Sequence, residues 1–290
     1  MRIAVLGPGG VGGLLAVLLA RAGSDVVVLA REATAARIAA HGLRLTSHRY
    51  GDVTAHPAAA ERLDGPVDAC VVAVKAPQLD DALSRVPADV LDGAVLLPLL
   101  NGFEHMTVLR RRYPSARVAA GAIRVVASRT APGEIRHEGE LAAVQLTPGA
   151  DELAHALEQA GLDVTVRDDE AGLLWDKVCF LAPVALLTTS MGAPLGEVRD
   201  RRGEDLRAVM EEVAAVARAE GARANADVVW RFTQDVPAGM TSSMQRDAAA
   251  GQPTELDAIG GAVLRAAQRH GVEVPVTRRI VEELRARLGD

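Results

Sequence analysis

The sequence predicts an α/β protein in which a doubly wound parallel sheet is followed by an all-helical domain. Short β-rich runs alternate with helical stretches from Met1 to about Arg167, which is typical of a sheet built from βαβ units. After Asp168 the apolar residues recur with helical spacing instead. We therefore expect one domain over residues 1–168 and a second over residues 169–290. Because no Gly/Ser linker separates them, we expect close packing, with the active site between the two domains.

The strands expected in the sheet are short apolar runs that are rich in β-branched residues. In chain order they are Arg2–Leu6, Asp25–Leu29, Ala69–Val74, Ala94–Leu97 and Arg117–Ala120. Three further β-rich runs, which we expect to extend or cap the same sheet, are Ile123–Ala127, Leu141–Leu146 and Asp163–Val166. The helices expected in the second domain are Asp169–Leu187, Gly203–Glu220, Ser243–Ala250, Glu255–His270 and Pro275–Leu288.

The composition is that of a globular chain with small molecules as partners. The 290 residues are 49 % hydrophobic, which is enough for a sizeable packed core. The net charge is −6 and the basic residues are scattered, so we expect neither nucleic acid nor an anionic membrane as a partner. Cys70, Cys179 and the seven histidines form no metal-ligand spacing. We predict core positions for both cysteines and no metal site.

The amino-terminal segment imitates a secretory signal peptide, because Arg2, the apolar stretch Leu14–Ala20 and the small-residue triplet Ala20–Ala22 occur in the expected order. Five glycines precede the apolar stretch, however, and a second apolar strand follows it directly. No other segment approaches the roughly 18 apolar residues that a membrane span needs. We therefore expect a soluble, cytoplasmic protein.

A glycine-rich motif lies between the first expected strand and a helix expected over Gly13–Ala22. It reads Gly7-Pro8-Gly9-Gly10-Val11-Gly12. In a βαβ unit Gly7 permits the tight turn, Gly9 lets the backbone approach a diphosphate, and Gly12 lets helix and strand pack closely. The amino terminus of the helix offers free N–H groups to phosphate. The motif in this context predicts a Rossmann-type domain that binds a nicotinamide dinucleotide.

The choice of cofactor is predicted at the end of the second strand, where an enzyme that uses NAD usually places an acidic residue on the ribose 2′-hydroxyl. Here the strand ends in Leu29-Ala30-Arg31. A guanidinium suits a 2′-phosphate through its charge and its paired hydrogen bonds, so Arg31 favours NADPH. Glu32 is the competing candidate, because a shift of one residue would place a carboxylate near the ribose.

Two polar residues follow expected strands, and ligands of an open α/β sheet bind beyond the carboxyl ends of its strands. Lys75 follows Ala69–Val74, and Asn101 follows the apolar run Val95–Leu100. Each is a candidate to contact the nicotinamide ribose or a substrate carboxylate. The alternative is that they are solvated loop residues.

Lys177 is the first candidate for a general acid. Reduction of a ketone by hydride leaves a developing alkoxide that needs a proton donor. A partly buried lysine can serve, because burial lowers a lysine pKa from about 10.4 towards neutrality, whereas arginine stays protonated. Of the 32 basic residues only Lys75 and Lys177 are lysines. The alternative for Lys177, which lies in the apolar segment Leu173–Phe180, is a lysine on a helix surface.

The sequence resembles the ketopantoate reductases (2-dehydropantoate 2-reductases) over nearly its whole length. The resemblance is carried by several motifs: the glycine-rich motif with Arg31, Val74-Lys75-Ala76, Leu100-Asn101-Gly102, Leu174–Lys177, Thr241–Asp247 and Gly251–Asp257. The last two are the most specific, because they reproduce the family's spacing together. The resemblance implies a Rossmann-type domain and an all-helical domain of the 6-phosphogluconate dehydrogenase C-terminal type. It also implies NADPH-dependent reduction of a 2-keto acid to a 2-hydroxy acid in pantothenate biosynthesis.

The resemblance also implies roles for single residues. Lys177 corresponds to the catalytic acid, and Glu255 to the carboxylate that orients it or holds a substrate hydroxyl. Ser243 would bind the substrate carboxylate, while Lys75 and Asn101 would lie near the nicotinamide ribose and the substrate. The resemblance implies either a monomer or a homodimer.

Two departures from the family pattern bear on the substrate. Four and eight residues after the catalytic lysine the family usually has asparagines on one helical face, and here these positions are Leu181 and Ala185. Each lost buried hydrogen bond typically costs on the order of 1–3 kcal/mol, so we expect a more hydrophobic pocket that fits ketopantoate less well. The second departure is Glu104, where the family tends to have glycine, which adds negative charge after Asn101-Gly102.

Two other functions stay open at this point. One is a D-2-hydroxyacid dehydrogenase that uses NADH, which shares the chemistry. The other is a non-catalytic protein that binds NADP(H), which the two lost asparagines would fit. The retention of Lys177 in so lysine-poor a chain argues against the second.

Overall fold

The computed structural model describes residues 1–289, and the chain divides into two compact units. Unit 1 comprises Met1–Leu100 and His105–Glu170. Unit 2 comprises the short segment Asn101–Glu104 together with the chain from Ala171 onward. The segment that carries Asn101 therefore belongs to unit 2, although the chain on both sides of it belongs to unit 1.

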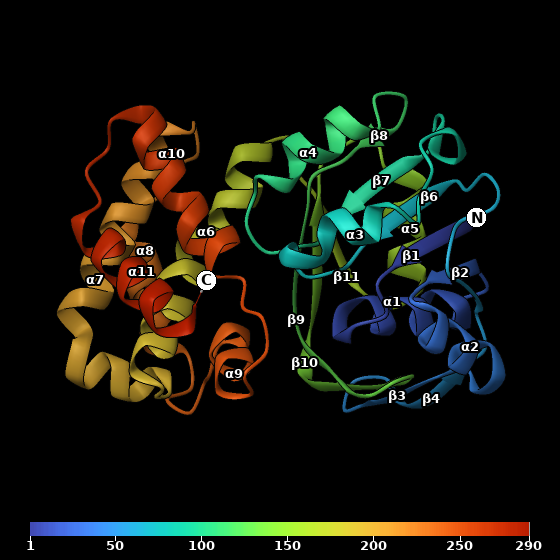
Figure 1. Ribbon diagram of the computed structural model, residues 1–290, viewed down its shortest axis with the longest axis horizontal. Helices are drawn as coiled ribbons and strands as arrows, with labels where there is room; N and C mark the ends of the chain where they lie inside the picture. Colours follow the sequence, from blue (N-terminus) through green and yellow to red (C-terminus); the bar gives the residue numbers. More distant parts are fainter. Residues whose placement is uncertain (290) are drawn as a thin grey trace. The chain divides into compact units, whose positions relative to one another are not determined.

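Unit 1 contains a six-stranded parallel sheet in the order β5-β2-β1-β6-β7-β8 (Figure 1). The strands are β1 (Arg2–Leu6), β2 (Asp25–Leu29), β5 (Ala58–Ala60), β6 (Ala69–Val72), β7 (Val95–Pro98) and β8 (Arg117–Val118). In chain order along this sheet the arrangement is 3-2-1-4-5-6, the doubly wound Rossmann order. The predicted fold class is confirmed, and the point at which the strand order reverses lies between β1 and β6.

The later β-rich runs do not extend this sheet, so that expectation was wrong. They form a second, five-stranded sheet with strands that the sequence did not predict. Its strands are β3 (Leu43–Ser47), β4 (Gly51–Ala55), β9 (Gly121–Ala131), β10 (Glu134–Leu146) and β11 (Asp163–Val166). The long hairpin of β9 and β10 supplies its centre, because β10 pairs with β9, β3 and β11.

Helix α1 (Gly10–Arg21) lies in the core of unit 1, where residues of both sheets cluster around it. Its eight residues from Gly12 to Leu19 are all buried, as expected for a helix that is apolar on every side. The helix begins at Gly10 and not at Gly13 as expected. At Gly10 a Cβ atom would lie 2.3 Å from the carbonyl oxygen of Ala127 on β9, so a glycine is required for this approach. The segment that imitates a signal peptide is thus the β1–α1 unit of the fold.

The remaining helices of unit 1 connect the strands. They are α2 (Glu32–His41), α3 (Leu79–Leu83), α4 (His105–Arg112) and α5 (Asp151–Gln159), with 3₁₀ turns at Ala76–Gln78 and Asp89–Leu91. Apolar residues of α3 and α4 pack with strands of the parallel sheet in a core cluster that includes Tyr113, whereas those of α2 and α5 belong to the cluster around α1.

Unit 2 is helical, as predicted. Its elements are α6 (Glu170–Met191), α7 (Leu195–Ala219), α8 (Ala226–Asp235), α9 (Ser243–Ala249), a π-helical turn (Asp257–Gly261), α10 (Ala262–His270) and α11 (Pro275–Leu288). Helix α8 was not expected from the sequence, and the single helix expected over Glu255–His270 is a π-helical turn followed by α10. Helix α6 is long and apolar enough for a membrane span by length and composition, but 67 % of that window is buried within the protein. It therefore serves as the core helix of unit 2.

Candidate active site

The glycine-rich motif forms a tight turn at the carboxyl end of β1. The Gly7 amide donates a hydrogen bond to the Leu29 carbonyl oxygen of β2 (3.0 Å), and Gly7 has a φ of +91°, which favours glycine. A Cβ atom at Gly7 would lie 2.4 Å from Cγ1 of Val74, so the turn packs directly against the segment after β6. The motif thus lies where the strand order reverses, which is where open α/β sheets bind their ligands.

The turn also has the shape that a dinucleotide diphosphate requires. A Cβ atom at Gly12 would lie 2.1 Å from the Gly7 carbonyl oxygen, so turn and helix are in close contact there. A Cβ atom at Gly9, in contrast, would meet no atom within 4 Å. No side chain caps α1, and the first N–H groups of a helix have no acceptor within it. Open space beside uncapped amides fits a diphosphate.

Arg31 occupies the N-cap position of α2, two residues after the end of β2. Its side chain is 73 % exposed and forms an ion pair with Asp81 of α3, with 3.6 Å between Nη2 and Oδ2. Asp81 also accepts a hydrogen bond from Arg85 (3.3 Å). Glu32 is the first residue of α2, where a carboxylate is stabilised by the helix dipole. Of the two candidates for the ribose site, Arg31 is thus paired with Asp81, whereas Glu32 lies in the first turn of α2.

If Arg31 binds the 2′-phosphate of NADPH, as the sequence predicts, the Asp81 carboxylate competes for the same guanidinium. We then expect the substitution Asp81→Asn to lower the KM for NADPH by up to about fivefold. An exposed ion pair contributes up to about 1 kcal/mol, which sets this limit. The KM for NADH should stay the same. The control is Asp80→Asn, which neutralises the neighbouring carboxylate in the first turn of the same helix. An unchanged NADPH preference in Asp81→Asn, or an equal gain in Asp80→Asn, would contradict the prediction.

Lys75 lies at the carboxyl end of β6 and is half-buried. It occupies the N-cap position of the 3₁₀ turn Ala76–Gln78, where its carbonyl oxygen accepts a hydrogen bond from the Gln78 amide (2.9 Å). Its neighbour Val74 contacts the position of Gly7, as described above. The structure thus brings Lys75 and the glycine-rich turn to the same edge of the sheet.

In unit 2, Asn101 and Glu255 come together although 154 residues separate them. The Asn101 side-chain amide donates a hydrogen bond to Oε2 of Glu255 (2.8 Å). Glu255 is only 5 % exposed, so its carboxylate needs such donors to offset the cost of burial. Both residues were predicted site residues, but the sequence did not predict this contact between them.

Helix α6 carries Lys177, Leu181 and Ala185 at intervals of four residues, which places them along one side of the helix. Lys177 and Leu181 are half-buried, and Ala185 is fully buried in the core of unit 2. Farther along this helix, the Thr188 hydroxyl forms a hydrogen bond with the Ser242 hydroxyl (2.9 Å). The part of α6 that follows the candidate acid is therefore apolar up to Leu187, and its first polar residue is Thr188.

Ser243 is the first residue of α9 and is half-buried. The residue before it, Ser242, caps the helix, because its Oγ accepts a hydrogen bond from the Gln245 amide (3.0 Å). The bond between Ser242 and Thr188 therefore joins the start of α9 to α6. It brings Ser243 close to the helix that carries Lys177.

Neither cysteine has the character of a reactive thiol. Burial raises the pKa of Cys70 to about 12 and that of Cys179 also to about 12. Both side chains are free and buried. Over residues 1–289 no group of three or more His, Cys, Asp or Glu side chains is arranged to hold a metal ion.

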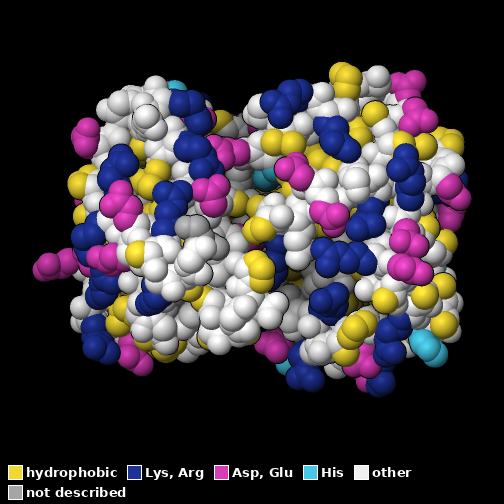
Figure 2. All heavy atoms as spheres, in the orientation of Figure 1, with side chains coloured by type: hydrophobic (Ala, Val, Ile, Leu, Met, Phe, Trp, Pro, Cys, Tyr) yellow, Lys and Arg dark blue, Asp and Glu magenta, His cyan; other side chains and the backbone are white. Residues whose placement is uncertain are grey.

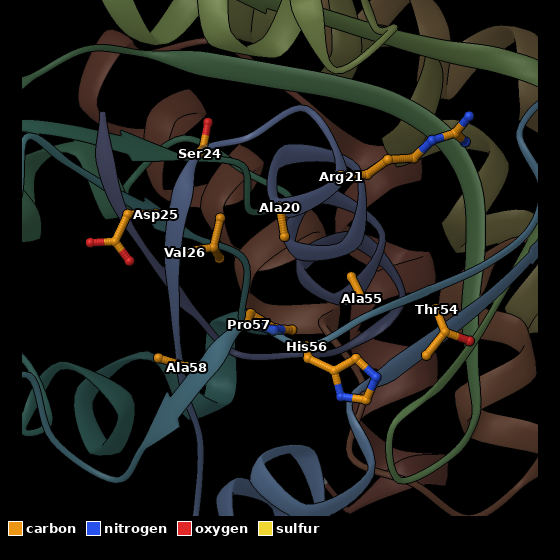
Figure 3. A pocket seen from close by; sticks show the side chains of 10 residues that line it. All are labelled: Ala20, Arg21, Ser24, Asp25, Val26, Thr54, Ala55, His56, Pro57 and Ala58. Atoms are coloured by element: carbon orange, nitrogen blue, oxygen red, sulfur yellow. The ribbon is translucent and has the colours of Figure 1, made fainter.

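A cavity of about 350 Å³ lies at the opposite edge of unit 1, at the amino ends of β2 and β5 (Figure 3). Its polar lining comes from Arg21, Ser24, Asp25, Thr54 and His56. None of the predicted site residues lines it. It is therefore distinct from the site around the glycine-rich turn, which lies at the carboxyl ends of the strands.

Both units match protein-family models. Residues 3–151 match the model described as "Ketopantoate reductase PanE/ApbA", and residues 171–288 match the model of the C-terminal region of the same family. The chain belongs to the ketopantoate reductase family. Enzymes of this family are NADP-dependent oxidoreductases that act on CH–OH groups, and the chain is an oxidoreductase of this type with NADPH as its cofactor.

Relatives span the whole chain. A 2-dehydropantoate 2-reductase of Mycobacterium tuberculosis is 32 % identical over 292 residues, which cover 98 % of this chain and 97 % of the relative. One of Halobacterium salinarum is 31 % identical over 298 residues, covering 98 % of each chain. Among solved structures, a ketopantoate reductase from Ralstonia eutropha JMP134 has a TM-score of 0.90 at 29 % identity, covering 99 % of this chain and 98 % of that one.

A D-mandelate dehydrogenase, solved with NADH and anilino(oxo)acetate, has a TM-score of 0.91. The alignment covers 100 % of this chain and 99 % of the dehydrogenase. The identity is 23 %, so this likeness shows the fold alone. The fold of ketopantoate reductases thus also occurs in a dehydrogenase whose structure contains NADH.

Proposed function

We propose that the chain reduces a 2-keto acid to the 2-hydroxy acid with NADPH, as a reductase of the 2-dehydropantoate 2-reductase type. The observation that carries this proposal is the buried Glu255 carboxylate, held by Asn101 in the same unit as Lys177. A buried carboxylate with an amide donor is suited to hold a polar ligand or a protonated amine in a fixed position. The residues proposed for the cofactor lie in unit 1 apart from Asn101, and those proposed for the substrate include Lys177, Ser243 and Glu255 of unit 2.

Each of the proposed cofactor residues contacts a particular part of the dinucleotide. The uncapped amides after Gly9 bind the diphosphate, and the Arg31 guanidinium binds the 2′-phosphate. Lys75 and Asn101 contact the nicotinamide ribose and the substrate. When bound, NADPH supplies the hydride that the carbonyl carbon accepts.

Lys177 supplies the proton. Its protonated Nζ donates a hydrogen bond to the carbonyl oxygen, and the proton moves to that oxygen as negative charge develops there. The new O–H bond replaces one N–H bond, so Lys177 ends the step as a neutral amine and takes a proton back from solvent. Glu255 orients the ammonium or holds a substrate hydroxyl, while Ser243 binds the substrate carboxylate.

The side of α6 beyond Lys177 bears on which 2-keto acid fits. Leu181 is half-buried and offers no hydrogen bond to a polar substituent, and Ala185 lies fully buried in the apolar core cluster behind it. We therefore propose that a 2-keto acid with an apolar side chain is a better substrate than ketopantoate, whose hydroxyl would lose a partner. The loss of one such bond costs on the order of 1–3 kcal/mol, or about 5- to 150-fold in kcat/KM.

The experiment is a panel of 2-keto acids, including ketopantoate and 4-methyl-2-oxopentanoate, each measured with NADPH and with NADH. We expect turnover with NADPH and a higher kcat/KM for the apolar substrate. A preference for NADH would favour the D-2-hydroxyacid dehydrogenase instead, and no turnover with any keto acid would favour a non-catalytic NADP(H)-binding protein. Higher activity on ketopantoate would overturn the proposed role of Leu181 and Ala185.

We further propose a cytoplasmic location, because the apolar amino-terminal segment is part of the core of unit 1. The proposed partners are the small-molecule cofactor and substrate. For the assembly we keep the two predicted states, monomer and homodimer, which sedimentation measurements distinguish.

A further inference from the structure

One guanidinium in unit 2 binds two separate acidic segments. Arg265 of α10 donates to both carboxylate oxygens of Glu104, from Nε to Oε1 (3.0 Å) and from Nη2 to Oε2 (2.7 Å). It also donates to both carboxylate oxygens of Asp257, from Nη1 to Oδ1 (2.9 Å) and from Nη2 to Oδ2 (3.0 Å). Paired hydrogen bonds of this kind fix the relative orientation of the planar groups as well as their distance.

The two acidic residues belong to the two segments that form the Asn101–Glu255 contact. Glu104 follows Asn101 by three residues, and Asp257 follows Glu255 by two. Arg265 therefore ties together both sides of the 2.8 Å hydrogen bond between the Asn101 amide and the Glu255 carboxylate. The extra negative charge that the sequence places at Glu104 is paired with this guanidinium.

The backbones of the two segments are also in close contact. Gly102 has a φ of +83°, and a Cβ atom there would lie 2.4 Å from the Ala258 carbonyl oxygen. Ala258 belongs to the π-helical turn Asp257–Gly261, and π turns are frequent at functional sites. The segment Asn101–Glu104 thus lies directly on this turn, with Arg265 joining the two.

Asp257 is itself held in place from a second helix. Arg285 of α11 donates to its Oδ1 (3.0 Å), and the hydrogen bonds from Arg265 hold the pKa of Asp257 below its usual range. Asp257 therefore stays charged at neutral pH and provides a fixed point for Arg265. Arg269 adds a weaker ion pair to Glu104, at 3.8 Å.

We infer that Arg265 is a positioning residue, which holds Asn101 against Glu255 by binding Glu104 and Asp257 at the same time. This inference rests on the proposed function, in which Asn101 and Glu255 contact the substrate or cofactor. Arg265 acts through the backbone segments that carry these two side chains, because its hydrogen bonds hold Glu104 and Asp257 on the same segments. Basic and acidic side chains are interspersed over the face of the molecule that Figure 2 shows.

The test compares Arg265→Met with the matched control Arg279→Met. Arg279 also binds two carboxylates, of Asp205 (2.8 Å) and Glu283 (3.2 Å), and its side chain is 46 % exposed, against 41 % for Arg265. With NADPH and a 2-keto acid, we expect kcat/KM to fall at least tenfold in Arg265→Met and no more than twofold in Arg279→Met. For Glu104→Gln, which preserves the shape of the side chain, we expect a loss of kcat/KM between those of the two arginine variants. Equal losses in the two arginine variants would overturn the inference.

A double substitution separates positioning from general stabilisation. In an Asn101→Ala background, Arg265→Met should lower kcat/KM by less than twofold, because the side chain that it positions is already absent. Losses that multiply in the double variant would show that Arg265 acts independently of Asn101, and would overturn the inference.

Amide hydrogen exchange tests the same inference without activity. We expect the amides of residues 101–104 to exchange at least tenfold faster in Arg265→Met than in the wild type, and at the wild-type rate in Arg279→Met. Unchanged exchange in Arg265→Met would overturn the positioning role whatever the activity. Faster exchange in a protein that reduces no keto acid would instead contradict the proposed function and leave the positioning of the segment intact.

Discussion

Replacing Lys177 with methionine is expected to lower kcat for keto-acid reduction by about 10²- to 10⁴-fold, the range for loss of a positioned general acid. Methionine keeps the length and helix propensity of the side chain, so α6 should stay intact. NADPH binding should also stay the same, because the predicted cofactor residues other than Asn101 lie in unit 1. Stopped-flow measurement of NADPH oxidation gives kcat, and fluorescence titration gives the dissociation constant for NADPH.

Lys177→Arg is the matched control for this prediction. It preserves the positive charge and the helical position, but a guanidinium does not release a proton at neutral pH. We therefore expect kcat to remain at least about a hundredfold below the wild type, while the KM for the keto acid recovers in part. Turnover near the wild-type value in either variant would show that another group supplies the proton, and the proposed role of Lys177 would fail.

The parts of the fold that could be predicted from the sequence are those with local patterns. β1, the glycine-rich turn and β2 follow one another within 29 residues, and each has a clear signal of periodicity or turn residues. Helices α9 and α11 were also predicted close to their bounds. In each case the residues that specify the element lie within it or next to it.

The second sheet could not be predicted, because its pairing partners are far apart in the chain. β3 pairs with β10, about 90 residues away. β3 alternates buried and exposed residues over only five positions, and β4 has a single buried residue, Ala55. Such short alternation is weak on its own. A better signal was present in Gly10, since a glycine within the first turn of a helix implies the close approach of another backbone.

In the candidate site, single residues could be predicted from the sequence, but contacts between distant residues could not. Lys177 was found because lysine is rare in this chain, Asn101 because it follows an expected strand, and Glu255 through the family resemblance. The contacts of Asp81 with Arg31 and of Arg265 with Glu104 were missed, since 161 residues separate the latter pair and both residues have ordinary surface chemistry. Charged residues that act through a distant partner leave no local pattern.

Gly9→Ala is expected to weaken NADPH binding by about 10- to 100-fold while leaving the Tm unchanged. A Cβ atom at Gly9 would meet no atom of the protein within 4 Å, and Gly9 has a φ of −75°, which alanine adopts without strain. The methyl group would therefore occupy only the space proposed for the diphosphate. The loss of one charge-assisted hydrogen bond costs about 1.5–3 kcal/mol, which gives the expected range.

Two other glycines make this test specific. Gly239→Ala also adds a methyl group in open space, but far along the chain in unit 2, and should change neither the Tm nor NADPH binding. Gly12→Ala should lower the Tm, because its Cβ atom would lie 2.1 Å from the Gly7 carbonyl oxygen. If Gly9→Ala binds NADPH as tightly as the wild type, the diphosphate does not lie against Gly9. A fall in Tm in that variant would show instead that the space beside Gly9 is filled by the protein itself.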